Sequence, residues 1–357
     1  YGIGYYILSE NKHGTELLGL FTLLNAVIHF IVSLILYKKK LADKNLFYLV
    51  LALVITFITL AAPVQLNGGW VTIFWTAEAA ILFYLARVKK IAIYEKLAFP
   101  LIFIAFISLL QDWTTIYGIY LGASATTPFL NVGFLTGIIF IAGFAWMTNI
   151  NVKNTTAVTD WLWMRQILNY VLPSMLIVVV YSTFERELTT YFNSLFDSTK
   201  IILNPSKKTT DAQYIYNNNY FTLKSTWAFI YTMFFAAALT YFNIKKIRNS
   251  SFAVANLVIN LLIVLFFLVS GLYLLSELRE TYLNPEKYFV IGSSNIILRY
   301  IALAFFAILI ASIYQLQRSA LLKINLKTIL DYVLYISILW IISSELINIL
   351  EEIIWKK

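Results

Sequence analysis

One carboxyl side chain, Glu78, lies near the centre of an apolar stretch of seventeen residues that runs from Trp70 to Ala86. A charge at the midplane of a bilayer costs at least about 3 kcal/mol. Such a group therefore needs a partner, a water-filled cavity, or a bound proton that keeps it neutral. Glu78 could act as a proton- or ion-linked carboxyl, or as a substrate anchor. It could equally be a hydrogen-bonded group that locks two helices together, because positions 76–80 are otherwise threonine and alanine, which allow close helix packing.

Polar side chains also occur inside other apolar stretches. His29 has Asn25 one turn earlier on the same helical face. A pair formed by Glu78 and His29 across two helices would make a proton relay. A histidine beside an asparagine can also simply complete a hydrogen bond between helices. Asn260 follows Asn256 by four residues, a spacing typical of amides that join neighbouring helices at about 0.6 kcal/mol per hydrogen bond.

Eight charged residues gather near predicted helix ends on one side of the membrane, and we call them the outer charge cluster. They could line an outward-facing polar vestibule, with Arg299 paired to an acid from the segment 277–280. We favour the simpler interpretation that they are ordinary charges at the membrane interface. The members are Glu185, Arg186, Glu187, Glu277, Arg279, Glu280, Arg299 and Glu345.

Motifs of common enzyme classes are missing from the sequence. It contains no cysteine and only two histidines, which excludes a thiolate site and argues against a protein-built zinc centre. It has no P-loop, no dinucleotide-binding glycine fingerprint and no Gly-x-Ser-x-Gly elbow. We therefore expect no cofactor and no metal, assign no catalytic residue, and regard a membrane enzyme as the least supported function.

The composition indicates a polytopic membrane protein. Of the 357 residues, 60% are hydrophobic and 13% are charged, and the mean hydropathy is +0.77. Soluble domains are about 45–50% apolar and about 25% charged. The net charge of +9 comes from basic residues in short segments between apolar runs, so it reports membrane topology rather than nucleic-acid binding. We expect contact with the lipid bilayer and none with nucleic acid.

About ten apolar runs are long enough to predict transmembrane helices, since about 20 helical residues cross the hydrocarbon core. We therefore predict an all-α bundle in which the helices follow one another as hairpin pairs, a single transmembrane domain over residues 1–357. The predicted spans are Leu17–Tyr37, Leu46–Val64, Trp70–Ala86, Leu97–Leu110, Val132–Met147, Ile167–Phe184, Trp227–Ile244, Phe252–Leu275, Ile296–Gln315 and Ile329–Ile349.

Basic residues predict the orientation. If ten helices alternate, the clusters at 38–44, 87–96, 153–165, 245–248 and 318–327 all fall on one side, which the positive-inside rule makes cytoplasmic. The segment 185–226 is then the largest outward loop, on the periplasmic side of a bacterial inner membrane, with a short amphipathic helix inside it. The chain begins at Tyr1, and residues 1–8 are too short to span, so we expect further sequence upstream.

One stretch resembles a known family. A helix ends at Thr59-Leu60-Ala61-Ala62-Pro63-Val64, and Gly69-Trp70 then opens a helix containing Trp75-Thr76-Ala77-Glu78-Ala79. This pattern, with Leu-Asn-Ala at 24–26 before it, resembles the bacterial membrane family known only as domain of unknown function 2339. The segment 256–317 is similar to that family's C-terminal hairpins, whereas 185–226 has no counterpart. The resemblance implies a many-helix inner-membrane protein, often with upstream helices, in which Trp75 and Glu78 are motif positions without an assigned role.

Taken together, these features favour a non-enzymatic membrane protein that serves as a scaffold or accessory subunit of a cell-envelope complex. Its partners would be membrane or periplasmic proteins. The alternative is a proton-linked transporter or lipid-handling protein that uses Glu78.

Overall fold

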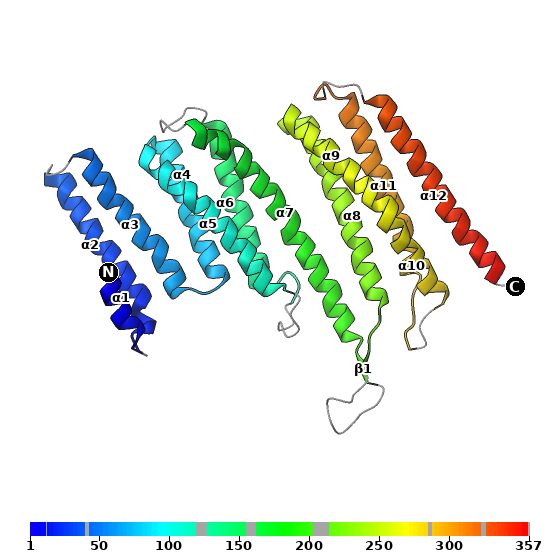
Figure 1. The fold of residues 1–357 in the computed structure, drawn as a ribbon, viewed down its shortest axis with the longest axis horizontal. Coiled ribbons are helices and arrows are strands. Elements are labelled where there is room, and N and C mark those ends of the chain that lie inside the picture. Colours follow the sequence, from blue (N-terminus) through cyan, green and yellow to red (C-terminus); the bar gives the residue numbers. More distant parts are fainter. Residues whose placement is uncertain are drawn as a thin grey trace. The chain divides into compact units, whose positions relative to one another are not determined.

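The computed structural model describes residues 1–11, 13–39, 43–118, 127–154, 162–202, 214–284, 288–322 and 326–355. This part of the chain is almost entirely helical (Figure 1). Ten of its helical segments are long and apolar enough to cross a membrane. The predicted fold class, an all-α polytopic membrane protein, is confirmed. Lys40 and Lys323, which contributed to the predicted orientation, lie outside the described residues.

The helices follow one another with short connections. In chain order they are α1 (Gly2–Ser9), the 3-10 turn η1 (Thr15–Leu17), α2 (Leu18–Lys39), α3 (Lys44–Gln65), α4 (Gly69–Lys89), α5 (Ala92–Ile116), α6 (Val132–Lys153), α7 (Leu162–Ser198), α8 (Asn219–Phe242), the π-helical segment η3 (Asn243–Ile247), α9 (Ser250–Phe266), the π-helical segment η4 (Phe267–Gly271), α10 (Leu272–Leu283), α11 (Ser294–Arg318) and α12 (Lys327–Trp355). Two short strands, β1 (Ile201–Ile202) and β2 (Tyr214–Ile215), pair antiparallel between α7 and α8.

The segment 185–226, expected as an outward loop with one short helix inside it, is more helical than the sequence indicated. Helix α7 continues to Ser198 and α8 already begins at Asn219. Hydropathy alone indicates a helix end at the polar residues after Phe184. A helix can continue through them, because its own backbone hydrogen bonds persist and it still buries one face, including Glu187 and Phe192. The connection between the two helices is therefore only the segment 199–218.

The chain divides into two compact units, Tyr1–Phe184 and Glu185–Lys357. We call them unit 1 and unit 2. The boundary falls inside α7, where no glycine- or proline-rich linker marks it. Each unit is described by itself.

Helix α4 is central to unit 1. It packs along α5 and α6, and α3 lies against it from the hairpin formed by α2 and α3. The core between α4, α5, α6 and α7 contains fully buried Phe83, Ile102, Phe140 and Leu168. The two α6 phenylalanines, Phe140 and Phe144, stack with ring centroids 3.8 Å apart.

Glycines let α6 approach its neighbours closely. A Cβ atom added at Gly137 would lie 2.7 Å from Oγ1 of Thr183 on α7, and one at Gly143 would lie 2.9 Å from Cγ2 of Thr76 on α4. Small residues at such positions allow the backbone contact that drives helix association in membranes.

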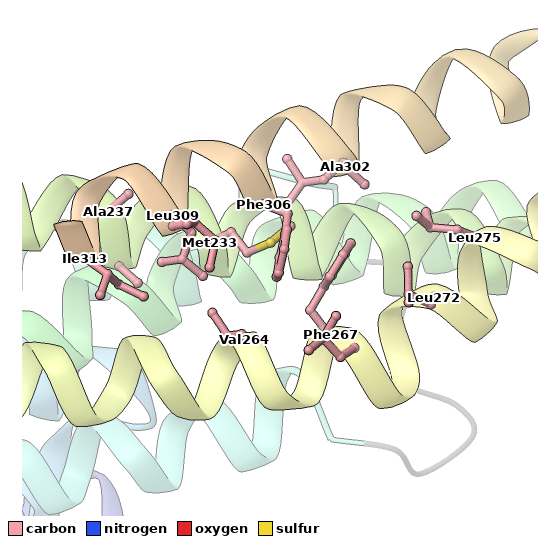
Figure 2. Close-up of a cluster of buried hydrophobic side chains, with 14 of the residues drawn as sticks. Met233, Ala237, Val264, Phe267, Leu272, Leu275, Ala302, Phe306, Leu309 and Ile313 are labelled. Carbon is pink, nitrogen blue, oxygen red and sulfur yellow. The ribbon is translucent and has the colours of Figure 1, made fainter. Parts of the chain in front are cut away.

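Unit 2 is built around α8 and α11, which pack along each other, with α9, η4 and α10 beside them. Figure 2 shows side chains from these helices meeting in one cluster. Phe267 and Phe306 stack with centroids 4.6 Å apart. Helices α9 and α10 form one span, Ser250–Leu283, interrupted by η4, whose wider turn places Phe267 in this core.

Replacing Gly137 by leucine should lower the stability of the protein by about 1–3 kcal/mol, because the added side chain overlaps Thr183. Thermal unfolding of the detergent-solubilised protein, followed by loss of the monodisperse peak, would measure the change. Ala145→Leu on the exposed face of the same helix is the matched control and should have little effect. Equal effects of both substitutions would contradict the close packing of α6.

Candidate functional site

Glu78 lies half-buried on the face of α4 that meets α3. Its Oε1 accepts a hydrogen bond of 2.8 Å from the Thr59 hydroxyl on α3. Its Oε2 is buried and has no hydrogen-bond partner among the described residues. The motif carboxyl thus joins two helices through one of its oxygens.

Trp75 belongs to the same contact, through the backbone of Thr59. Its indole Nε1 donates to the Thr59 carbonyl oxygen at 3.0 Å. That carbonyl has no helical partner, because the residue four positions later is Pro63, which lies inside α3 and has no N–H. Trp75 therefore supplies the hydrogen bond that the proline removes. We call Thr59, Pro63, Trp75 and Glu78 the α3–α4 lock.

The Thr59 hydroxyl has one proton and two acceptors. It lies 2.9 Å from the Ile55 carbonyl oxygen of its own helix and 2.8 Å from Glu78 Oε1. The hydroxyl can donate its single proton to only one of these two oxygens at a time. An ionised Glu78 would take the Thr59 proton and would still lack a cation, since no ion pair to it occurs in the part of the chain that the structure describes. The geometry therefore suits the neutral carboxyl better.

His29 and Asn25 do not join Glu78. The His29 ring stacks on Phe57 of α3, with centroids 5.2 Å apart and planes 6° from parallel. The Asn25 side chain donates to the Phe21 carbonyl oxygen of its own helix at 2.8 Å. Within the described residues no hydrogen bond links His29 to Glu78, so the structure does not bring a relay together.

A buried ion pair joins α4 to α5, and sequence reasoning missed it. Arg87 and Glu95 lie 2.7 Å apart, with side chains 0% and 1% exposed. Arg87 is in the last turn of α4 and Glu95 in the first turn of α5, where each helix dipole favours that sign of charge. The guanidinium also lies over the Phe83 ring, 5.3 Å from its centroid. In the sequence, Arg87 belongs to a basic cluster at 87–96 that we used only to predict orientation. An arginine and a glutamate on either side of a short connection could have suggested the ion pair.

The other end of the α4–α5 interface holds a second buried acid. The Thr72 hydroxyl donates to Asp112 Oδ2 at 2.6 Å and lies 2.5 Å from the Ser108 hydroxyl. Thr72 and Arg87 are fifteen residues apart on α4, about 22 Å along a helix. The hairpin is thus fastened near both ends, and small or apolar side chains such as Ala79 and Ala105 fill the interval.

Some members of the outer charge cluster are buried in unit 2 rather than exposed on its surface. Arg299 on α11 forms an ion pair with Glu345 on α12, whereas the sequence suggested an acid of 277–280 as one possible partner. Glu187 is fully buried. Arg186, Glu187 and Arg279 each interact with a neighbouring group.

Two of the three remaining members have partners on their own helix. Glu185 accepts from the Thr189 hydroxyl at 3.0 Å, one turn along α7. Glu277 accepts from the Tyr273 hydroxyl, one turn earlier on α10. Glu280 lies at the end of α10. The sequence analysis did not identify a group of polar side chains that joins α8, α10 and α11. In this group Asn295 donates to Asn219 at 2.7 Å and to Thr281 at 3.1 Å.

Asn260 joins α9 to α8. Its amide donates to the Thr240 hydroxyl at 2.9 Å, and both side chains are buried. Asn256, one turn earlier, is also buried. This is the geometry of an interhelical hydrogen bond.

The polar side chains of the spanning helices thus pair locally instead of converging on one point. In the described parts of the chain, no group of three His, Cys, Asp or Glu side chains could hold a metal ion. Comparison with known proteins found no matching family model, curated protein or solved structure. The family resemblance stays a prediction.

Trp75→Phe should lower stability by about 1 kcal/mol, because the Thr59 carbonyl then loses the indole donor. In a Pro63→Ala background the cost should shrink, since an alanine at position 63 can supply the N–H that helix geometry requires. The double-mutant cycle, measured by thermal unfolding, reports this coupling. Additive effects of the two substitutions would contradict the lock, and Trp70→Phe at an exposed position serves as the control.

Arg87→Met should cost about 3–5 kcal/mol, because it leaves Glu95 buried without a counter-charge. The double substitution Arg87→Met, Glu95→Leu should recover most of that loss. Lys89→Met on the exposed face of α4 is the control for removing a positive charge. A double variant as unstable as the single one would show that the pair does not act as a unit.

Proposed function

We propose that this protein is a non-enzymatic component of a bacterial inner membrane, a scaffold or accessory subunit of a cell-envelope complex. The observation that carries the proposal is the local pairing of its intramembrane polar groups. Thr59 with Glu78, Arg87 with Glu95, Thr72 with Asp112, and Asn260 with Thr240 each join two neighbouring helices. Such contacts hold helices in place and leave few polar groups for a substrate or a reaction.

Support also comes from the parts of the chain that can meet a partner. Helix α12 is exposed along most of its length and rests on its neighbours through few residues, such as Leu330. The end of α7 and the described residues that follow it, 199–202 and 214–218, carry polar side chains such as Lys200 and Asn218. A partner protein can bind at such places without any change in the helix pairs.

A proton-linked transporter that uses Glu78 is the second candidate. One observation favours it: Glu78 Oε2 is buried without a hydrogen-bond partner among the described residues, and the Thr59 hydroxyl can change the acceptor to which it donates. A carboxyl that gains and loses a proton during transport would use this arrangement.

Replacing Glu78 separates the two functions. Under the scaffold proposal Glu78→Gln keeps the bond to Thr59 and should leave stability and partner binding unchanged, whereas Glu78→Leu should lower stability by about 1 kcal/mol. The measurement is cross-linking in intact membranes, followed by native mass spectrometry of the purified complexes. A protein that is monomeric and without a partner of fixed stoichiometry would contradict the proposal.

Proton movement is measured on the same variants in proteoliposomes with an enclosed pH indicator. If the wild type dissipates a pH gradient and Glu78→Gln does not, while both remain folded, the transporter interpretation replaces the scaffold. Glu16→Gln, on the exposed turn η1, is the control for removing a carboxylate.

A further inference from the structure

An apolar groove runs between α8 and α9 in unit 2. Its volume is about 520 Å³. One wall is a stripe of α8 side chains, Ser225, Ala228, Phe229 and Thr232, and the other is the α9 face from Ile259 to Phe266. The spacing of three and four residues places each stripe on one side of its helix. The groove extends over eight residues of each helix, a rise of about 10 Å.

The origin of the groove lies in how the two helices are tied together. Near their connection Asn260 bonds to Thr240, and Asn243 receives the backbone N–H of Asn249 at 3.1 Å. The core side chains of Figure 2, Met233 and Val264 among them, fill the adjoining faces of α8 and α9. Next to this core, the small side chain of Ala228 leaves a space between the two helices, and this space is open to the outside of the protein.

The groove has no polar group that requires a ligand. The Ser225 hydroxyl donates to the Phe221 carbonyl oxygen at 3.0 Å, and the Thr232 hydroxyl donates to the Ala228 carbonyl oxygen at 2.7 Å. Both hydroxyls are therefore already used within α8. A polar ligand could therefore only donate to one of these hydroxyl oxygens, whereas a hydrocarbon chain needs no hydrogen bond at all. Because α8 and α9 lie within membrane-spanning segments, the hydrocarbon at hand is the acyl chain of a lipid.

A cation, Lys224, adjoins the first lining residue of α8, on the side of that helix that meets α7. Lys224 precedes Ser225, and its Nζ lies 4.5 Å from the centroid of the Phe221 ring, one turn beyond Ser225. The ammonium donates to Asn193 Oδ1 at 3.0 Å and interacts electrostatically with Glu185, which holds it at this level of α8. An ammonium has three donors, so two remain for the oxygens of a phosphate.

From this juxtaposition we infer that the groove binds an acyl chain of a phospholipid whose phosphate lies against Lys224. The chain fills the gap beside Ala228, and the headgroup stays at the end of α8 nearest Asn219. This lipid site lies in unit 2 and Glu78 lies in unit 1, so the inference does not depend on which of the two proposed functions is correct.

The probe for this site is a phospholipid with a photoactivatable acyl chain, added to the purified full-length protein in nanodiscs. Mass spectrometry of the digested protein locates the label. Wild-type label should concentrate in 225–232 and 259–266. Ala228→Phe fills the groove and should reduce that label about tenfold, the factor that corresponds to 1.4 kcal/mol of lost binding. Ala238→Phe, at an exposed position on the same helix, should leave it unchanged.

The headgroup contact is tested without altering the packing. Lys224→Gln should reduce labelling by the phospholipid about fivefold, which corresponds to the roughly 1 kcal/mol that one lysine contributes beside anionic headgroups. It should not change labelling by a photoactivatable fatty alcohol, which lacks phosphate. Lys246→Gln, at an exposed position in η3, is the control. Label spread evenly over lipid-facing helices such as α2, or cross-links from the groove to unit 1 or to a second copy of the chain, would overturn the inference. Equal labelling of the wild type and Lys224→Gln by the phospholipid would also overturn it.

Discussion

Hydrocarbon cannot supply a hydrogen bond, so each polar group carried into the membrane by these helices must find a partner within the protein. This constraint explains the arrangement of the structure more directly than hydrophobic burial does, because lipid is as apolar as the helix faces. Polar and charged side chains are few in the spans. Many hydroxyls bond to a carbonyl of their own helix, as at Thr232 and Thr240, whereas several acids, bases and amides join one helix to the next. The α4–α5 hairpin is the strongest example. It has an ion pair near one end and a Thr–Asp contact near the other.

The α3–α4 lock shows how the same constraint connects distant motif residues. A proline in α3 frees one carbonyl group, the tryptophan on α4 bonds to it, and the threonine that owns this carbonyl bonds to the glutamate. Four positions that look like separate features in the sequence are therefore one physical unit. The predicted resemblance to a bacterial membrane family includes these positions. The lock offers a physical reason why they would occur together.

Much of the fold could be predicted from the sequence, because helix length and hydropathy are local properties. The number of spans and the all-α class follow from them. The ends of α7 and α8 could not be predicted, since a helix can continue through polar residues when one face remains buried, and hydropathy does not report this.

The partners of Glu78 could not be predicted either, because nothing in the spacing of residues 59 and 78 indicates that α3 and α4 face each other there. His29 was expected as a possible neighbour because of its chemistry, but its ring lies against Phe57. Arg87 belongs to a basic cluster that predicts membrane orientation, but in the structure it forms a buried ion pair with Glu95 on the next helix.

The central claim is that the polar groups of the spans are used in helix pairs and do not line a path for water. The absence of native cysteine allows a direct test, because single cysteines can be placed at Glu78, Thr72 and Asn260. Each variant is exposed in sealed vesicles to a membrane-impermeant thiol reagent from either side, with a cysteine at exposed Lys246 as the positive control. We predict that the control reacts from one side and that the three interior positions react from neither. Rapid labelling at position 78 would show that water reaches the carboxyl, and it would contradict this account in favour of a transport function.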